Sequence, residues 1–311
     1  MPGRPITIMG IFVADLAFRT PKLPAWGETV LGQSFKLGPG GKGSNQAVAA
    51  ARMGGKVNFV SKLGLDAFGD IARKMYAEEG VSTAHLYETS EIATGGAAIL
   101  VDAAKGDNAI VVFPGSCAHL TTGEIDRARP AIGASAVFMT NLELPVPLVM
   151  HGLKLARSLG VTTVLNPAPA VPVPDEIFGL CDYLTPNETE ATGLSGLPVA
   201  SAEEAGRAAE ALIARGCPNV VITLGSRGAL IRNKAVARLV PAFEVGAIVD
   251  TTGAGDAFCG AFAVALGEGQ DIVAATRWGC AAAGIKVTGW GTAPAMPRRP
   301  AVDALLAKSG G

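Results

Sequence analysis

The segment Asp250-Thr-Thr-Gly-Ala-Gly-Asp256-Ala-Phe-Cys-Gly260 carries the strongest local signal in this chain. Its small residues, Gly253, Ala254 and Gly255, let the backbone turn tightly and point successive N–H groups at one place. The helical pattern that opens at Asp256 adds unpaired N–H donors and the positive end of a helix dipole. The segment therefore predicts an anion site at a helix N-terminus.

Asp256 would stand beside this anion site. A carboxylate in that position could accept the proton of an attacking hydroxyl during phosphoryl transfer. Aspartate is also a common helix cap, so the residue taken alone could have a purely structural role. The local sequence leaves both roles open.

A second glycine-rich segment is Gly38-Pro-Gly-Gly-Lys-Gly-Ser-Asn-Gln46. Its lysine is followed by glycine rather than by serine or threonine, which excludes a Walker A loop. Its glycine spacing formally matches the fingerprint of a nicotinamide dehydrogenase, but Pro39 lies inside the turn and Asp66 does not directly end a strand. The segment is better explained as a loop that approaches a ligand closely, with Lys42 and Asn45 supplying polar contacts.

Two weaker signals follow expected strands. In Thr185-Pro-Asn-Glu-Thr-Glu-Ala191, Asn187 and Glu190 are one helical turn apart, which suits outer-shell coordination of Mg²⁺. The same pair is also typical of a capping box. The segment Ile222-Thr-Leu-Gly-Ser-Arg-Gly228 could hold a nucleotide, but it could equally be an ordinary tight turn.

Short apolar strands alternate with alanine-rich helical stretches along the chain. This alternation predicts an α/β fold with a central, mostly parallel sheet flanked by helices. The predicted strands are Ile6–Gly10, Val57–Leu63, Ala136–Met139, Thr162–Leu165, Tyr183–Thr185 and Val220–Thr223. The predicted helices are Ser44–Met53, Gly69–Glu79, Pro147–Leu159, Ala202–Arg215 and Asp256–Gly267.

Two stretches break this alternation, Ala14–Leu37 and Ala93–Phe113. They contain strand-like segments and turn residues but little helical periodicity. We expect them to pair as a small β-sheet lid over the carboxyl ends of the main strands, where open α/β sheets bind ligands. With no repeat and no low-complexity linker, residues 1–311 are expected to form a single domain.

The composition narrows the class of protein. The 311 residues are 49% hydrophobic and 17% charged, with a net charge of −1, so a packed core is expected and disorder is not. The basic residues are not clustered, which argues against nucleic acid or a membrane as the partner. The chain has five widely spaced cysteines without a CxxC pair, three isolated histidines and no recognisable signal peptide. These features predict reduced thiols, no zinc site and a cytoplasmic location.

Read together and in order, the motifs resemble those of the ribokinase-like (PfkB) family of carbohydrate kinases, and the resemblance covers nearly the whole chain. The segments that carry it are Gly40-Gly-Lys-Gly-Ser-Asn-Gln-Ala-Val-Ala-Ala50, Leu165-Asn-Pro-Ala-Pro-Ala170, Thr185-Pro-Asn-Glu-Thr-Glu-Ala191, Ile222-Thr-Leu-Gly-Ser-Arg-Gly228 and Asp250-Thr-Thr-Gly-Ala-Gly-Asp256. The resemblance implies a core sheet of about nine strands. It also implies a β-sheet lid that often forms a dimer contact, so a homodimer is expected.

The resemblance further implies a role for each matching residue. Asp256 would be the general base, and the N–H groups of Ala254, Gly255 and Asp256 would form the anion hole. Asn187 and Glu190 would organise Mg²⁺ and the phosphates. The residues expected to line the ATP site are Thr223, Gly225, Ser226, Gly228 and Cys280. The residues expected to hold sugar hydroxyls are Asp15, Gly41, Lys42, Asn45 and Glu143.

A monovalent-cation site for K⁺, built mostly from backbone carbonyls, is also implied beside the anion hole. The matching positions are Asp250, Thr252, Lys286, Gly289, Gly291 and Ala295. Ala295 replaces a hydroxyl residue, so one potassium ligand is expected to be lost or supplied by water.

The sugar site carries a second departure from the family pattern. Members that phosphorylate ribose usually have asparagine two residues before the sugar-binding aspartate, and this chain has Val13 there. The resemblance implies ATP-dependent phosphorylation of a sugar primary hydroxyl, with D-ribose to D-ribose 5-phosphate as the leading reaction. Fructose, deoxyribose and nucleosides remain alternative substrates because Val13 removes a polar contact. A non-catalytic sugar- or nucleotide-binding regulator is a further alternative.

Overall fold

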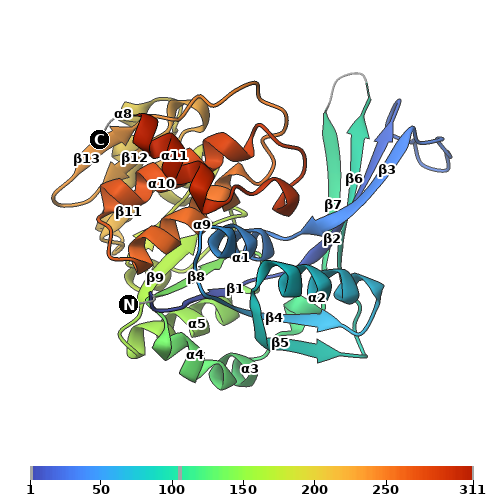
Figure 1. Ribbon diagram of the computed structural model, residues 1–311, viewed down its shortest axis with the longest axis horizontal. Helices are drawn as coiled ribbons and strands as arrows, with labels where there is room; N and C mark the ends of the chain where they lie inside the picture. The colour runs from blue at the N-terminus through green and yellow to red at the C-terminus, as the bar shows by residue number, and fades with distance from the viewer. Residues whose placement is uncertain (1–2, 104–106, 310–311) are drawn as a thin grey trace.

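The computed structural model describes residues 3–103 and 107–309. Its centre is a nine-stranded sheet in the order β13-β12-β11-β10-β9-β8-β1-β4-β5 (Figure 1). Neighbouring strands from β5 to β11 are parallel, and β12 and β13 extend the sheet as antiparallel strands. The bounds of these strands are β1 Ile6–Met9, β4 Val57–Gly64, β5 Ser82–Thr89, β8 Val137–Asn141, β9 Thr162–Asn166, β10 Tyr183–Leu184, β11 Asn219–Thr223, β12 Ala229–Arg232 and β13 Ala237–Val240.

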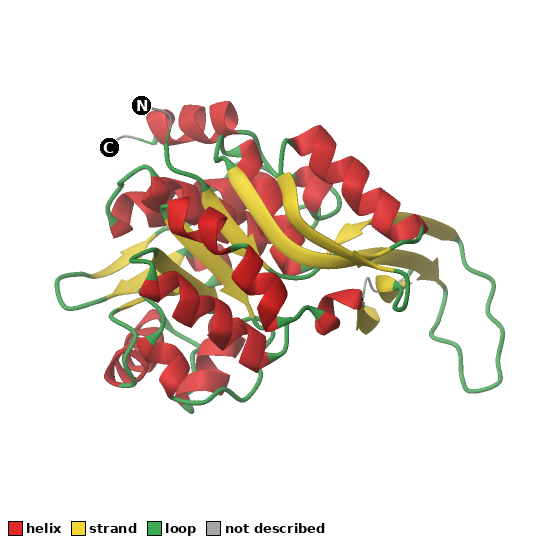
Figure 2. Cartoon of the chain, turned by 90° about the horizontal axis from the view of Figure 1, so that it is seen from below, coloured by secondary structure: helices red, strands yellow, loops and turns green. Residues whose placement is uncertain are grey.

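Helices cover both faces of this sheet (Figure 2). One face buries its apolar side chains against α1 Lys42–Arg52, α2 Ala67–Glu79, α9 Ala254–Gly267, α10 Ile272–Lys286 and α11 Arg299–Lys308. The other face buries them against α3 Thr122–Arg127, α4 Arg129–Ala134, α5 Val146–Ser158, α6 Glu176–Gly179, α7 Glu188–Ser195 and α8 Ala202–Ala214. Three short 3₁₀ turns are η1 Ser116–His119, η2 Gly225–Arg227 and η3 Ala293–Ala295. The mostly parallel α/β architecture predicted from the alternation is confirmed.

A separate four-stranded sheet projects from this core, in the order β3-β2-β6-β7 (Figure 1). Its strands are β2 Val13–Thr20, β3 Ser34–Gly40, β6 Thr94–Asp102 and β7 Asn108–Gly115. They fall in the two stretches that break the alternation, so the prediction of a small second sheet is confirmed. Positions 104–106 of the expected lid, and 1–2 and 310–311 at the ends of the expected domain, lie outside the described residues.

The six predicted strands and five predicted helices all form, with bounds that differ by a few residues. Three strands of the main sheet were missed. Residues 82–89 of β5 are mostly half-buried or exposed at the edge of the sheet, so their hydrophobic pattern is weak. The strands β12 and β13 have four residues each, too few for a period to be recognised. Within the described part of the chain, no helix combines the length and apolar character needed to cross a lipid bilayer.

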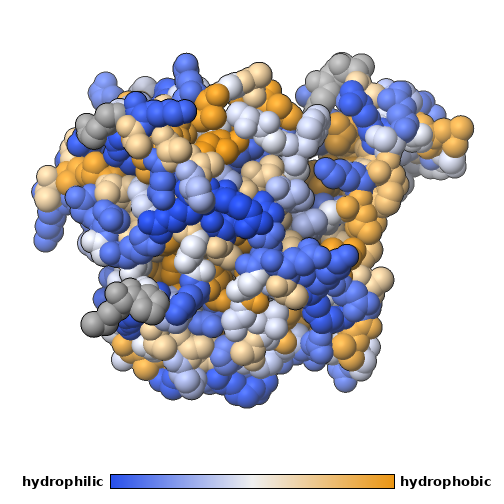
Figure 3. All heavy atoms as spheres, viewed as in Figure 1, coloured by the Kyte–Doolittle hydropathy of each residue, from blue (hydrophilic) through white to orange (hydrophobic). Residues whose placement is uncertain are grey.

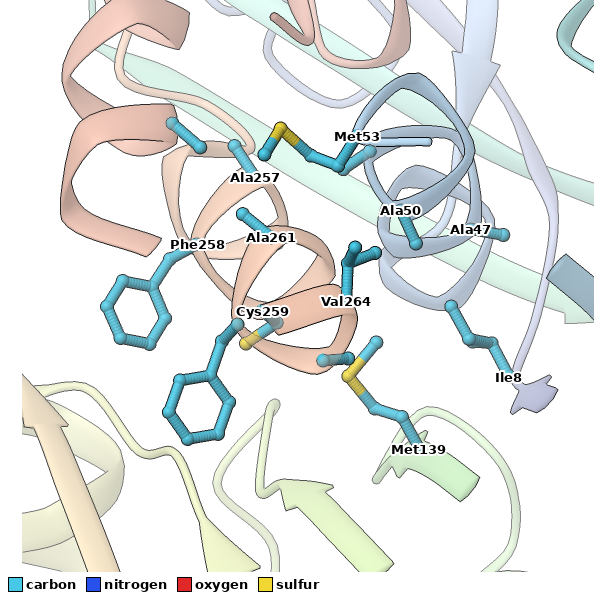
Figure 4. Close-up of a cluster of buried hydrophobic side chains, with 14 of the residues drawn as sticks. Ile8, Ala47, Ala50, Met53, Met139, Ala257, Phe258, Cys259, Ala261 and Val264 are labelled. Atoms are coloured by element: carbon cyan, nitrogen blue, oxygen red, sulfur yellow. The ribbon is translucent and has the colours of Figure 1, made fainter. Parts of the chain in front are cut away.

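The close crossing of α1 and α9 is the packing feature that matters most for the site. Ala50 of α1 and Ala261 and Val264 of α9 belong to one buried cluster (Figure 4). At Gly260 the two helices are so close that an added Cβ would lie 2.6 Å from the Ala49 Cβ. The alanines and glycines of the two motifs therefore bring the N-terminal turns of both helices together.

Candidate active site

A cavity of about 130 Å³ opens at the carboxyl ends of the parallel strands, where the N-termini of α1, α7 and α9 converge. Parallel strands present their carboxyl ends at one edge of a sheet, so motifs far apart in the chain meet there. The cavity is lined by Lys42, Asn166, Ala168, Thr185, Asn187, Glu190, Thr223, Gly253, Gly255, Asp256 and Cys259. All five motifs that carried the resemblance therefore border this cavity, and the segment at the end of β11 does so through Thr223.

Asp256 is buried at the first turn of α9, but it does not cap the helix. The N-cap is Gly253, with φ of 81°, and it makes no side-chain cap. The Asp256 carboxylate instead accepts a hydrogen bond from Asn45 Nδ2 at 3.0 Å and one from Gln46 Nε2 at 3.2 Å. Both donors come from α1, so the α1–α9 crossing fixes the orientation of the carboxylate. The capping alternative for Asp256 is therefore wrong.

The N–H groups at the start of α9 are only partly free. Ala254 N donates to Thr251 O at 3.1 Å, so this member of the expected anion hole is already engaged. Among the described residues, the N–H groups of Gly255 and Asp256 have no acceptor. They are donors of the kind that a helix N-terminus offers to an anion.

Several acidic groups surround Lys42 at the cavity. Its backbone N donates to Glu143 Oε2 at 2.8 Å. Burial raises the pKa of Glu143 to about 8; Lys42 opposes this rise, and Asp256 adds to it. Burial also raises the pKa of Asp256, while Lys42 and the hydrogen bonds from Asn45 and Gln46 act against the shift. The site thus holds a buried carboxylate whose proton affinity is increased, which suits a general base.

The glycine-rich segment before α1 allows a close backbone approach. Gly41 has φ of 89°, and a Cβ there would lie 2.5 Å from Ile11 O. The segment leaves β3, which is antiparallel to β2 in the small sheet, rather than a strand of a parallel βαβ unit. Asp66, the acidic residue that a dinucleotide site would need, caps α2 by accepting from Gly69 N at 2.9 Å. The fold therefore excludes the dehydrogenase interpretation.

Asn187 and Glu190 do form a capping box at the start of α7. Asn187 N and Nδ2 donate to the Glu190 carboxylate at 2.9 and 3.0 Å, and Glu190 N donates to Asn187 Oδ1 at 2.8 Å. Both residues also line the cavity, so the capping box does not exclude the expected ligand role, which stays a prediction. The described part of the chain has no group of three histidine, cysteine, aspartate or glutamate residues placed to hold a metal.

The glycine-rich end of β11 combines a tight turn with one cavity residue. Thr223 lines the cavity, and η2 follows it at once. Gly228 has φ of 100°, and a Cβ there would lie 2.0 Å from Val240 O, so only glycine fits beside β13. Gly225 and Ser226 lie in the 3₁₀ turn itself. Cys280 is buried in the middle of α10 within the core cluster.

The expected sugar residues of β2 lie beside the entrance to α1. The Asp15 carboxylate is so close to Gly40 that a Cβ at this glycine would overlap it, at 2.2 Å from Oδ1. Burial raises the pKa of Asp15 to about 6, and the negative charge of Asp256 adds to the shift. Val13 is buried between Gly40 and Gly95 of the neighbouring strands and belongs to a hydrophobic core cluster.

Three buried polar residues of the site, Gln46, Asn141 and Asn166, were not predicted from the sequence. Gln46 bridges the site, because its Nε2 donates both to Asp256 and, at 3.0 Å, to Asn166 Oδ1. Asn45 Oδ1, Gln46 Oε1 and Asn141 Nδ2 have no partner among the described residues. Such unsatisfied buried atoms are rare and suggest a polar ligand. Their positions in the sequence could have indicated the site, because Gln46 is the last residue of the glycine-rich segment, and Asn141 and Asn166 each end a buried strand.

The residues expected to bind K⁺ are arranged in a different way. Lys286 is buried, and its Nζ donates to Asp250 O at 2.7 Å. Both Asp250 carboxylate oxygens accept backbone N–H groups, from Thr252 at 2.9 Å and from Gly291 at 3.0 Å. Lys286 O accepts from Gly289 N at 3.1 Å. The Asp250 carbonyl, which the resemblance assigns to the potassium site, therefore already accepts an ammonium group.

Comparison with known proteins gives a consistent result. The profile of the pfkB family of carbohydrate kinases matches residues 4–299. A ribokinase of Haemophilus influenzae is 40% identical over 294 residues, which cover 94% of this chain and 95% of the relative. A deoxyribokinase of Salmonella typhi is 36% identical over 293 residues, covering 94% and 95%.

Solved structures agree with the sequence relatives. The structure of Arabidopsis thaliana ribokinase complexed with ribose and ATP matches with a TM-score of 0.92 at 29% identity, over 98% of this chain and 99% of that one. A ribokinase from Thermotoga maritima matches with a TM-score of 0.89 at 36% identity over the same shares. The family profile, the relatives and the geometry of the cavity lead to one conclusion: this chain belongs to the pfkB family of carbohydrate kinases.

Proposed function

We propose that this kinase transfers the γ-phosphoryl group of ATP to the primary hydroxyl of D-ribose, giving D-ribose 5-phosphate. The observation that carries the proposal is the buried Asp256 carboxylate at the N-terminus of α9, held by Asn45 and Gln46 and bordering the cavity with Lys42. The ribokinase relatives and the neighbour complexed with ribose and ATP support the choice of substrates.

In the proposed reaction Asp256 accepts the proton of the attacking hydroxyl. The new bond joins the sugar oxygen to the γ-phosphorus, and the bond from that phosphorus to the β-γ bridging oxygen breaks, which releases ADP. The free N–H groups of Gly255 and Asp256 stabilise the charge on the transferring group. Ala254 is left out of this anion hole because its N–H donates to Thr251.

We place the sugar between β2 and the start of α1. Asp15, Asn45 and the backbone of Gly41 would accept or donate hydrogen bonds to its hydroxyls, with Lys42 and Glu143 closing the pocket. The pKa of Glu143, raised to about 8 by burial, leaves this group largely protonated at neutral pH and able to donate a hydrogen bond. The unpartnered Asn45 Oδ1 is a natural acceptor for a sugar hydroxyl.

ATP would extend from the cavity over the end of β11. Thr223, Gly225, Ser226 and Gly228 would contact the nucleotide, with Cys280 of α10 near the base. Mg²⁺, when bound, would neutralise phosphate charge. Asn187 and Glu190 fit an outer-shell role, because the Glu190 carboxylate borders the cavity but is already anchored by Asn187.

Val13 favours a second candidate substrate, 2-deoxy-D-ribose. Val13 is buried and apolar. It would offer no hydrogen bond to a sugar hydroxyl, and a buried hydroxyl without a partner is disfavoured. The relatives include deoxyribokinases, which makes this substrate the natural comparison.

An ADP-release assay with MgATP would test both candidates across ribose, deoxyribose, fructose and several nucleosides. The highest kcat/KM on ribose supports the main proposal, and the highest value on deoxyribose supports the second. No turnover on any of these compounds would contradict both and favour a non-catalytic binding protein. The variant Val13→Asn should shift the ratio of the two sugars toward ribose, and an unchanged ratio would exclude Val13 as a specificity determinant.

We further propose that the small sheet forms a homodimer contact. Hydrophobic residues gather on this projecting arm (Figure 3). Four consecutive residues of β7 are exposed there, Ile110, Val111, Val112 and Phe113, and Val111 is 73% exposed. Exposed apolar groups of this kind often mark an interface. Light scattering should give twice the chain mass, and Val111→Glu or Val112→Glu should lower it; a monomeric parent protein would contradict the proposal.

The five cysteines are buried and unpaired, which is typical of a reducing compartment. Together with the proposed use of ATP, this supports a cytoplasmic location. Fractionation of cells that express the tagged chain would test it.

A further inference from the structure

Lys286 is the most unusual charged residue of the molecule outside the reacting groups. It lies in the last turn of α10 and is 0% exposed. Lysine is almost never fully buried unless a partner holds its ammonium group. Here the partner is a main-chain carbonyl, because Nζ donates to Asp250 O at 2.7 Å.

The surroundings of this ammonium group are those of a cation site. The negative charges of Asp250 and Asp256 act on it. It also lies at the carboxyl end of α10, where the helix dipole favours positive charge. Burial lowers the pKa of Lys286, while both aspartates oppose the shift and favour the charged form. An NH₃⁺ group has the charge of K⁺ and a similar size, so it can neutralise the same negative charges and occupy the same position.

The same contacts engage the groups of Asp250 that a separate monovalent cation would need. The Asp250 carbonyl already accepts the ammonium group, and each Asp250 carboxylate oxygen accepts a backbone N–H. Ala295 contributes a methyl group that lies against Gly289, where a hydroxyl would be needed as a ligand. A K⁺ ion at a similar distance from the same carbonyl oxygen would lie at most about 5.4 Å from Nζ, twice the hydrogen-bond length of 2.7 Å, and the two cations would repel.

We propose that the ammonium group of Lys286 is a built-in monovalent cation, and that this kinase therefore works without potassium. The proposal concerns the site beside the proposed anion hole and rests on the proposed kinase function only for its activity readout. Lys286 acts as a positioning residue. It holds the carbonyl of Asp250, the first residue of the segment that leads through Thr252 to Gly253. Gly253 is the N-cap of α9. The bond from Ala254 N to Thr251 O continues this ordered turn.

The first experiment replaces the cation around the unmodified protein. ADP release is measured with the tetramethylammonium salt of ATP and Mg²⁺, with KCl, NaCl or tetramethylammonium chloride at equal ionic strength. We expect the rates to agree within about twofold, since the cation that orders the turn is covalently attached. Activation by K⁺ of more than about tenfold would overturn the proposal.

A second measurement does not depend on activity. Tl⁺ is a spectroscopic substitute for K⁺, and its binding can be followed by ²⁰⁵Tl NMR in the absence of substrates. The thermal midpoint is recorded in KCl and in tetramethylammonium chloride. We expect no saturable Tl⁺ site and the same midpoint in both salts, because a cation that binds only the folded state would raise it. One saturable Tl⁺ site per chain that K⁺ displaces would contradict the inference even if no sugar substrate were known.

Two variants make the test specific to this side chain. Lys286→Ala should lower kcat, and K⁺ should restore part of the rate because the ion can enter the vacated space. Lys286→Met should lose activity without rescue, because it fills the space but carries no charge. Lys308→Ala is the matched control, since Lys308 also lies in the last turn of a helix but is exposed. Equal rates for Lys286→Met and the parent protein would overturn the proposed role.

If the protein phosphorylates no sugar tested, the function proposal fails while the Tl⁺ and thermal data still decide the cation question. If the kinase is active and K⁺-dependent, the function proposal stands and only the role of Lys286 fails. If a variant does not fold, the measurements on the unmodified protein remain decisive.

Discussion

Replacing Asp256 by asparagine tests the centre of the proposed mechanism. The change keeps the shape of the side chain but removes the base, and a positioned general base contributes about 10²- to 10⁴-fold to a rate. We therefore expect kcat to fall by about that factor, while ATP affinity changes little. The comparison is made by ADP release with the preferred sugar and by fluorescence titration of ADP.

The stability change should be small for a reason visible in the site. Asn45 and Gln46 each donate one hydrogen bond to Asp256, and an asparagine amide can accept only one of them. The lost bond costs about 1–3 kcal/mol. Burial raises the pKa of Asp256, so its charge opposes folding at neutral pH, and removing that charge offsets part of the loss. We expect a thermal midpoint within about 5 °C of the parent protein.

The pH profile adds an independent readout. Because the raised pKa lies above the ordinary value of 3.8, kcat/KM of the parent protein should fall as pH falls through it. This acidic limb should be absent in Asp256→Asn. Asp271→Asn serves as a control, since Asp271 caps α10 by accepting from Ala274 N and lies outside the cavity. Turnover of Asp256→Asn within about tenfold of the parent rate would refute the general-base assignment.

Three further changes test the electrostatics and packing of the site. Burial raises the pKa of Asp15 from 3.8 to about 6, so the charged carboxylate destabilises the ligand-free protein at pH 7.5. Asp15→Asn should therefore increase the free energy of unfolding at this pH by about 1–2 kcal/mol, a value reduced for the partial exposure of the group. Urea titrations should show that this gain vanishes near pH 4, where the carboxylate is protonated. Gly260→Ala places a Cβ 2.6 Å from the Ala49 Cβ and should cost about 1–3 kcal/mol, with kcat falling as α9 shifts; unchanged stability would contradict the close crossing. Glu190→Gln should raise the Mg²⁺ concentration needed for half-maximal rate while retaining the bond from Asn187 N, and an unchanged Mg²⁺ titration would exclude the proposed role.

Much of the fold follows from local patterns. Buried parallel strands such as β11 contain a continuous apolar run, Val220–Ile222. Helices such as α8 carry their own start signal, a capping box of Ser201 and Glu204. Edge strands lack these signals: β5 is half-exposed, and β12 and β13 are short, so the sequence did not reveal them. A hydrophobic period is clear only where one environment persists for several residues.

The candidate site divides along a similar line. The anion site could be predicted, because a Gly-Ala-Gly turn at a helix N-terminus points backbone N–H groups at one place. Whether Asp256 caps α9 was not predictable. It depended on two amide donors from α1, which lies some 210 residues earlier in the chain.

The sequence by itself thus determined the α/β class, the order of the motifs and the kinase family, since each is encoded in residues that are close along the chain. Only the tertiary structure decided how Gln46 joins Asp256 to Asn166, and that Lys286 turns its ammonium group onto the Asp250 carbonyl. The physical reason is that burial changes what a polar residue must do. An exposed lysine or glutamine side chain forms hydrogen bonds with water wherever it lies. A buried one needs a hydrogen-bond partner within the protein, and the packing of distant segments decides which partner is available.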